Sequence, residues 1–160
     1  MLWKLAFIGY FAGVVGGLGF LLNAVWAQRD LQAAESREFH ARNIDCLARN
    51  VYYEARGESL AGQYAVAQVT MNRRASLGYP KTVCEVVYQK DAFSWTAMGE
   101  LDAPAGEPWS RATKVAEDVY SGRRPVELHG VLHYHATYVA PEWSKEKERV
   151  ARIGRHVFYR

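Results

Sequence analysis

Two glutamates four residues apart, Glu54 and Glu58, stand in the stretch EARGE. Glu54 falls in the last turn of a predicted helix, at the edge of its apolar stripe, so we expect a half-buried side chain. Burial and the negative end of the helix dipole both favour the protonated carboxyl group, which predicts a raised pKa for Glu54. A carboxyl group that keeps its proton near neutral pH can act as a general acid.

The same stretch also fits an inert role. Gly57 is expected in the left-handed backbone that often ends a helix. Glu58 follows it, and its carboxylate could turn back to the helix end or to the guanidinium of Arg56. Taken alone, EARGE favours a helix end with a surface ion pair over a catalytic site.

The elements that would position Glu54 follow from the spacing of apolar residues. Helical spacing predicts four helices, over residues 43–56, 60–75, 82–89 and 108–120. Ser59 can cap the second helix, Thr82 and Glu85 form a capping box for the third, and Pro108 suits the start of the fourth.

After Pro125 the pattern changes from helical spacing to alternation. The stretch VELHGVLHYHATYV, residues 126–139, alternates around His129-Gly130, which predicts a β-hairpin with a turn at this dipeptide. RHVFYR, residues 155–160, could add a strand. The predicted fold class is α+β, mostly helical with a small late β-hairpin.

The first residues differ from the rest. Residues 5–25 contain no charged side chain, and a run of this length spans a bilayer. We therefore predict an N-terminal transmembrane helix or signal anchor over residues 1–27, a polar stalk over 28–42 and the domain over 43–160. Charges around the run favour an inner-membrane anchor with the domain in the periplasm. A cleavable signal peptide, with export after cleavage, is the alternative.

Composition restricts the partners. Aromatic residues make up 13% of the chain; such an excess is typical of sugar binding, although an aromatic core explains most of it. The net charge of +3 suits an anionic polymer such as a cell wall and is too weak to indicate nucleic acid. Nothing in the sequence calls for a cofactor.

The chain has two cysteines, Cys46 and Cys84. Export would favour a disulfide between them, closing a loop worth about 4 kcal/mol in the chain-entropy model. Two buried free thiols are the alternative, and the spacing excludes a cysteine zinc cluster because there is no C-x-x-C pair.

Three elements occur together and in order: EARGE, GQxAVAxVxxNR and YPxTVC. With LHYHATYVAPEWS and ARIGRHVFYR they resemble the SleB-type cell wall hydrolase family, relatives of the spore-cortex lytic enzymes with counterparts in proteobacteria and phages. The resemblance covers residues 45–160. The positions of Cys46 and Cys84 look like the pair of the non-spore branch. Relatives often carry a further cysteine after FSW; its absence here supports a Cys46–Cys84 bond.

The resemblance implies a lysozyme-like fold and cleavage of peptidoglycan between N-acetylmuramic acid and N-acetylglucosamine, with Glu54 as the acid. In a lytic transglycosylase the muramic 6-hydroxyl then closes on the sugar carbon and no second carboxylate is needed. A water-using muramidase of the lysozyme type needs one. Asp91, Glu100 and Asp102 lie in polar, loop-like stretches and could supply it, but none has the apolar setting of Glu54.

Other side chains are candidates for the sugar cleft, although core packing fits the aromatic ones equally well. We predict substrate contacts from Gln89, Phe93, Trp95, Tyr134 and His135, with Tyr138 and Asn72 as weaker candidates. Two further classes remain open. His129, His133 and His135 could bind zinc in a wall amidase or peptidase, and the aromatics could serve a non-catalytic wall-binding module. No metal site is predicted. A phage endolysin and a bacterial wall enzyme fit the sequence equally.

Overall fold

The computed structural model describes the backbone of residues 2–124 and 127–160, and the side chains of residues 23–124 and 127–160. The chain divides into two units, Met1–His40 and Ala41–Arg160. Helix α1 comprises Leu2–Ala55, and in the first unit the described side chains, residues 23–40, are exposed.

The predicted membrane segment, residues 5–25, lies almost wholly outside the residues whose side chains are described. Within the described part, none of the helices combines the length and the apolar character that a bilayer crossing requires. The anchor therefore stays a prediction.

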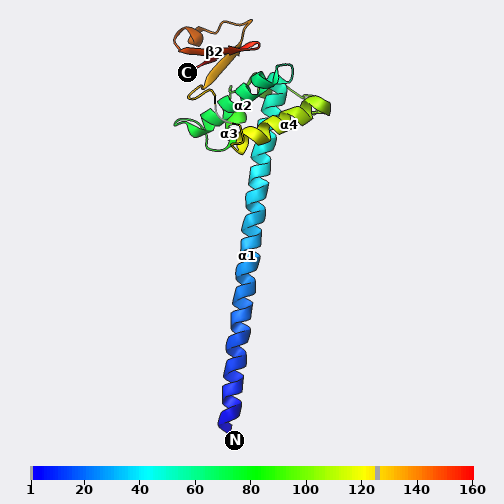
Figure 1. Ribbon diagram of the computed structural model, residues 1–160, viewed down its shortest axis with the longest axis vertical. Helices are drawn as coiled ribbons and strands as arrows, with labels where there is room; N and C mark the ends of the chain where they lie inside the picture. The colour runs from blue at the N-terminus through cyan, green and yellow to red at the C-terminus, as the bar shows by residue number, and fades with distance from the viewer. Residues whose placement is uncertain (1, 125–126) are drawn as a thin grey trace. The chain divides into compact units, whose positions relative to one another are not determined.

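The four predicted helices of the second unit form close to where the sequence places them, and two short 3-10 helices, η1 and η2, were not predicted (Figure 1). After α1 the helices are α2 (Leu60–Ala75), α3 (Val83–Val87), η1 (Ser94–Ala97), α4 (Gly106–Tyr120) and η2 (Glu142–Lys145). The Ser59 side chain caps α2 by accepting from the Gly62 N–H, and the capping box at Thr82 is present. Helix α4 begins at Gly106, two residues before Pro108. Proline is tolerated there because the N–H groups of the first turn have no intrahelical partner.

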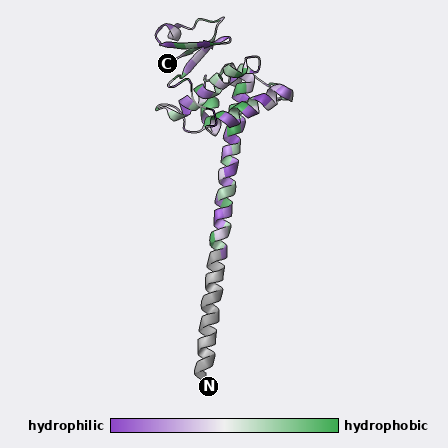
Figure 2. Ribbon diagram, viewed as in Figure 1, coloured by the Kyte–Doolittle hydropathy of each residue, from purple (hydrophilic) through white to green (hydrophobic). Residues whose placement is uncertain are grey.

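The core forms around α2, which packs against α3, α4 and β2. Apolar residues of α2 and of the last turns of α1 belong to one buried cluster, and both stretches carry the green of hydrophobic residues in Figure 2. The predicted stripe of α1 is buried, with Leu47, Ala48 and Val51 fully so. A disulfide joins Cys46 of α1 to Cys84 of α3, as predicted, so the last turns of α1 are tied covalently to the helix that follows α2.

The strands form one antiparallel sheet in the order β1-β3-β2, with β1 at His133–Ala136, β2 at Arg149–Ile153 and β3 at His156–Tyr159. Gly154 sits in the β2–β3 turn with a φ of 57°, a conformation that favours glycine. The class α+β, mostly helical with a small late sheet, is confirmed, and the predicted C-terminal strand is β3.

The predicted hairpin over residues 126–139 is wrong. Val126 lies outside the described residues, and Glu127 to Gly130 form bends and turns. The side chain of Asn72 explains this, because its Nδ2 donates to the carbonyl oxygens of Leu128 and Val131 at 2.6 and 3.0 Å. Asn72 of α2 thus holds both carbonyl groups, and the side chains of Leu128 and Val131 are buried. Strand β1 pairs instead with β3, the last strand of the chain.

Candidate active site

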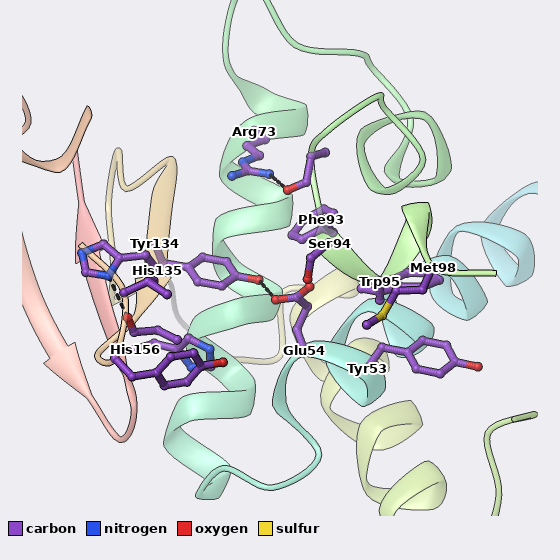
Figure 3. A pocket seen from close by; sticks show the side chains of 14 residues that line it. Tyr53, Glu54, Arg73, Phe93, Ser94, Trp95, Met98, Tyr134, His135 and His156 are labelled. Carbon is purple, nitrogen blue, oxygen red and sulfur yellow. Dashed lines mark hydrogen bonds between the residues drawn. The ribbon is translucent and has the colours of Figure 1, made fainter. Parts of the chain in front are cut away.

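An open groove of about 490 Å³ lies within the second unit, with Glu54 among the residues that line it (Figure 3). Its walls come from the end of α1, from α2, from the segment around η1 and from the sheet. The lining residues are Tyr53, Glu54, Arg73, Ala92, Phe93, Ser94, Trp95, Met98, Tyr134, His135, Ala136, Tyr138, Val139 and His156. Of the predicted site residues, Glu54, Phe93, Trp95, Tyr134 and His135 are brought together here, and so is the weaker candidate Tyr138.

Glu54 is half-buried in the last turn of α1, as predicted. The Tyr134 hydroxyl donates a hydrogen bond to its Oε2 at 3.0 Å. Burial raises the pKa of the Glu54 carboxyl group, and this outweighs the opposing effects of the Tyr134 hydrogen bond and the Arg73 charge. The direction predicted from the sequence is therefore confirmed, with burial as the main cause.

Tyr134 reaches Glu54 from β1, 80 residues further along the chain. Its ring packs against Phe93, Phe158 and His156 at centroid distances of 6.5, 5.6 and 5.1 Å. Burial, together with the nearby Glu54, holds the pKa of Tyr134 well above its usual value of 10.0. The phenol therefore stays protonated and donates its hydrogen to Glu54, a contact that the sequence did not predict.

Glu58 departs from its predicted position. Its side chain is 5% exposed and binds Arg155, not Arg56: the Arg155 Nε donates to Oε1 at 2.6 Å and the Arg155 backbone N–H to Oε2 at 3.0 Å. Burial acts to raise the pKa of Glu58, but these hydrogen bonds and the positive charge of Arg155 outweigh it, and the pKa is lowered.

Two neighbours explain where Glu58 goes. Arg56 turns away and lies over the Tyr52 ring, 4.9 Å from its centroid. Gly57 does not adopt the left-handed backbone that we predicted; a Cβ on it would lie 3.0 Å from Arg155 Nη2. The glycine therefore leaves room for Arg155, and Glu58 joins the end of α1 to the β2–β3 turn.

The aromatic candidates combine core packing with exposure to the groove. Trp95 stacks on Tyr53 with centroids 4.6 Å apart, and its Nε1–H donates to Asn50 Oδ1 at 2.9 Å. Phe93 is 4% exposed. His135 shares a hydrogen bond of 2.9 Å between its Nε2 and the Tyr159 hydroxyl. Their contact with substrate stays a prediction.

Several candidates lie away from the groove. Gln89 is exposed and does not line it, and Asn72 is engaged by the carbonyls described above. Asp91, Glu100 and Asp102 are likewise absent from its walls; the backbone carbonyl of Asp102 accepts from the Tyr53 hydroxyl. No candidate for a second carboxylate therefore reaches Glu54 in the described residues.

Sequence reasoning missed other groove residues: Tyr53, Arg73, Ser94, Met98 and His156. Tyr53 precedes Glu54 directly and could have been found from that position. Arg73 lies one helix away and His156 near the C-terminus, and neither carries a local signal that points to Glu54.

The histidine set does not form a metal centre. His133 and His135 share one face of β1, and both rings contact Trp143 at 5.6 and 5.7 Å. His129 lies on the preceding turn. Across the described residues, no three histidine, cysteine, aspartate or glutamate side chains come together as a metal site would require.

Comparison with known proteins decides the family. The family model described as Cell Wall Hydrolase matches residues 57–159, which is more than half of the chain. This chain belongs to the cell wall hydrolase family. The family indicated by the three sequence elements is confirmed, although the matched region begins three residues after Glu54.

Curated members of this family include spore cortex-lytic enzymes. The enzyme from Bacillus cereus is 30% identical over 120 residues, which are 75% of this chain and 45% of that protein. The Bacillus subtilis enzyme is 32% identical over 120 residues, 75% of this chain and 38% of that protein. The chain thus spans less than half the length of these relatives.

Two solved structures of this cell wall hydrolase type share the fold. The catalytic domain of the Bacillus cereus SleB protein superposes with a TM-score of 0.62 at 33% identity, over 74% of this chain and 89% of that one. The catalytic domain of the germination-specific lytic transglycosylase SleB from Bacillus anthracis gives 0.63 at 33% identity, over 74% and 93%. The second unit of this hydrolase therefore corresponds to nearly the whole of each catalytic domain.

Proposed function

We propose that this cell wall hydrolase cleaves the glycan strand of peptidoglycan between N-acetylmuramic acid and N-acetylglucosamine, as a lytic transglycosylase with Glu54 as its catalytic acid. One observation carries this proposal: among the described residues that line the groove, Glu54 is the one carboxyl group, and burial raises its pKa. Two-carboxylate glycosidases require a second acid beside the bond. The likeness to a lytic transglycosylase domain agrees with a one-carboxylate route.

In this proposal the two oxygens of Glu54 have different roles. Oε2 accepts from Tyr134, so the other oxygen is free to carry the proton and face the substrate. In the first step it protonates the glycosidic oxygen, the C1–O bond breaks, and positive charge develops at C1 of the muramic acid. The Tyr134 hydrogen bond then stabilises the carboxylate that is left.

The second step returns the proton. The muramic 6-hydroxyl attacks C1 and closes the 1,6-anhydro ring, while the hydroxyl proton passes to the Glu54 carboxylate. The enzyme ends in its starting protonation state, and no water is consumed. A single group thus acts first as acid and then as base.

Mass spectrometry of the products tests the proposal. Purified peptidoglycan digested by the protein should give muropeptides with anhydromuramic ends, lighter by one water than products with reducing ends. Reducing ends would instead establish the water-using muramidase. Binding without new ends would establish a wall-binding module, and release of free peptides would establish an amidase or peptidase.

We also propose that residues 5–25 anchor the protein in the inner membrane, with the hydrolase domain in the periplasm. The uncharged run supports this, and so does the disulfide, because such bonds persist in oxidising compartments. A periplasm-dependent reporter fused after Arg42 should be active. A reporter that stays in the cytoplasm contradicts the proposal, and the mass of the mature protein distinguishes an anchor from a cleaved signal peptide.

A further inference from the structure

Arg73 is a charged side chain in the wall of the groove that the proposed reaction does not use. It projects from α2, is 9% exposed and lines the same groove as Glu54 (Figure 3). Burying a guanidinium costs free energy unless its charge is compensated, so the presence of Arg73 here calls for a partner.

Its contacts within the protein fix its position without neutralising its charge. The Nε–H donates to the Leu132 carbonyl at 2.8 Å and Nη1 to the Ala92 carbonyl at 3.4 Å. The guanidinium carbon lies 5.0 Å from the Phe93 ring centroid and 5.9 Å from that of Tyr79. Nη2 makes no hydrogen bond in the described structure, and none of the described carboxylates forms an ion pair with Arg73.

The groove around Arg73 offers little negative charge. Glu54 is the one carboxyl group among the described residues that line the groove, and burial raises its pKa. Burial also lowers the pKa of His156, which disfavours a charged ring. The positive charge of Arg73 opposes the larger effect of burial on the pKa of Glu54, and it adds to the effect of burial that lowers the pKa of His133. Among the described residues that line the groove, Arg73 is the one arginine or lysine, so this wall of the groove suits an anionic group.

We propose that Arg73 binds a carboxylate of the peptidoglycan strand whose glycosidic bond lies at Glu54, and so selects the acidic substrate; this rests on the proposed function. A guanidinium binds carboxylates through parallel N–H donors, which a lysine ammonium cannot reproduce. Peptidoglycan offers such groups from two sources: the lactyl carboxylate of a muramic acid that carries no peptide, and the carboxylates of the peptide stems.

The test couples a change in the enzyme to a change in the substrate. We would measure kcat/KM on native peptidoglycan and on the same material with its carboxylates converted to methylamides, for wild type, Arg73→Gln and the control Arg152→Gln, an exposed residue of β2. Amidation should lower kcat/KM about 10-fold for wild type and the control, the scale of a charge-assisted hydrogen bond. Arg73→Gln should cleave both substrates at equal rates. An equal loss in wild type and Arg73→Gln overturns the proposal.

A second variant protects the test against a folding defect, because Arg73 also binds two backbone carbonyls. Arg73→Lys keeps the charge without the fork of donors. Its dependence on substrate carboxylates should be smaller than that of wild type, and a dependence as large as wild type overturns the proposal even if Arg73→Gln does not fold. Melting curves accompany both variants.

Two natural substrates distinguish the sources of the carboxylate. Glycan stripped of its peptides carries only lactyl carboxylates, and fully peptide-substituted glycan carries only those of the stems. The substrate on which Arg73→Gln loses activity identifies the group. If wild type produces no new glycan ends on any substrate, the proposed function fails. If it cleaves amidated and native material equally, the role of Arg73 alone fails.

Discussion

The two glutamates of EARGE belong to two regions that treat the same side chain in opposite ways. Glu54 lies in the last turn of α1 and lines the groove. It is half-buried, and its hydrogen-bond donor is the neutral phenol of Tyr134. Glu58, four residues later, is enclosed against the β2–β3 turn with a guanidinium and a backbone N–H as donors. The pKa of Glu54 rises and that of Glu58 falls.

This difference shows that burial alone does not make a carboxyl group into an acid catalyst. Glu58 is the more deeply buried of the two, yet its ionised form is stabilised because a positive charge and two N–H donors compensate for the lost water. Glu54 lacks a direct charged donor, so burial has the larger effect and its pKa is raised. The environment of Glu54 suits proton transfer, and the environment of Glu58 suits a structural link.

The largest expected effect is on catalysis at Glu54. Glu54→Gln keeps the shape of the side chain and an acceptor for Tyr134, but it cannot give a proton to the leaving oxygen. Cleavage of purified peptidoglycan should fall at least ~10²-fold, the usual scale of positioned acid–base catalysis. The free energy of unfolding should hold or increase, because a partly buried acid becomes a neutral amide. Near-wild-type activity in the folded variant would contradict the assignment of Glu54.

The matched substitution at Glu58 should reverse this pattern. Glu58→Gln removes the charge that Arg155 binds, and we expect a loss of about 2 kcal/mol in the free energy of unfolding, within the range for hydrogen bonds to charged groups. The Arg155 side chain is 67% exposed, so water limits the loss. Activity per folded molecule should stay close to that of wild type. Urea denaturation and assays below the transition measure both, and a large rate loss without destabilisation would place Glu58 in catalysis.

A smaller effect is expected at Tyr134. Tyr134→Phe removes the hydroxyl that stabilises the Glu54 carboxylate, and we expect kcat to fall about 10-fold, since one such hydrogen bond contributes about 1 kcal/mol or more. Activity should decline at high pH as Glu54 loses its proton. Without the Tyr134 hydrogen bond the pKa of Glu54 should rise further, so this decline should move to higher pH. A pH–rate profile that does not move would show that Tyr134 only packs against its neighbours.

The smallest expected effect is on stability as a function of pH, and its sign separates the two glutamates. A raised pKa, as for Glu54, gives stabilisation below the ordinary value of 4.5 that is lost as pH rises through the folded pKa. A lowered pKa, as for Glu58, gives stabilisation above 4.5 that is lost as pH falls through the folded pKa. Glu54→Gln should therefore reduce the loss of stability that occurs as pH rises above 4.5. Glu58→Gln should reduce the loss of stability that occurs as pH falls below 4.5. Melting temperatures across this range measure both, and changes of the same sign would remove the contrast.

Local features were predictable because their partners lie within a few residues. The cap at Ser59 and the capping box at Thr82 depend on hydrogen bonds between groups only three residues apart, and the buried stripe of α1 follows from helical periodicity. The same periodicity put Glu54 at the edge of that stripe and gave the direction of its pKa shift. The hairpin prediction failed because alternation around His129-Gly130 says nothing of Asn72, which binds this segment from a distant helix.

The sequence by itself determined the last turns of α1, the helices α2, α3 and α4, the half-buried setting of Glu54 and the family. Only the tertiary structure decided what each glutamate binds: Tyr134 lies 80 residues from Glu54, and Arg155 lies 97 residues from Glu58. Strand pairing and core packing set those partners, and neither leaves a local pattern that distinguishes one tyrosine or arginine from another. The buried Arg73 in the groove wall is of the same kind, since its position depends on carbonyls from two other segments.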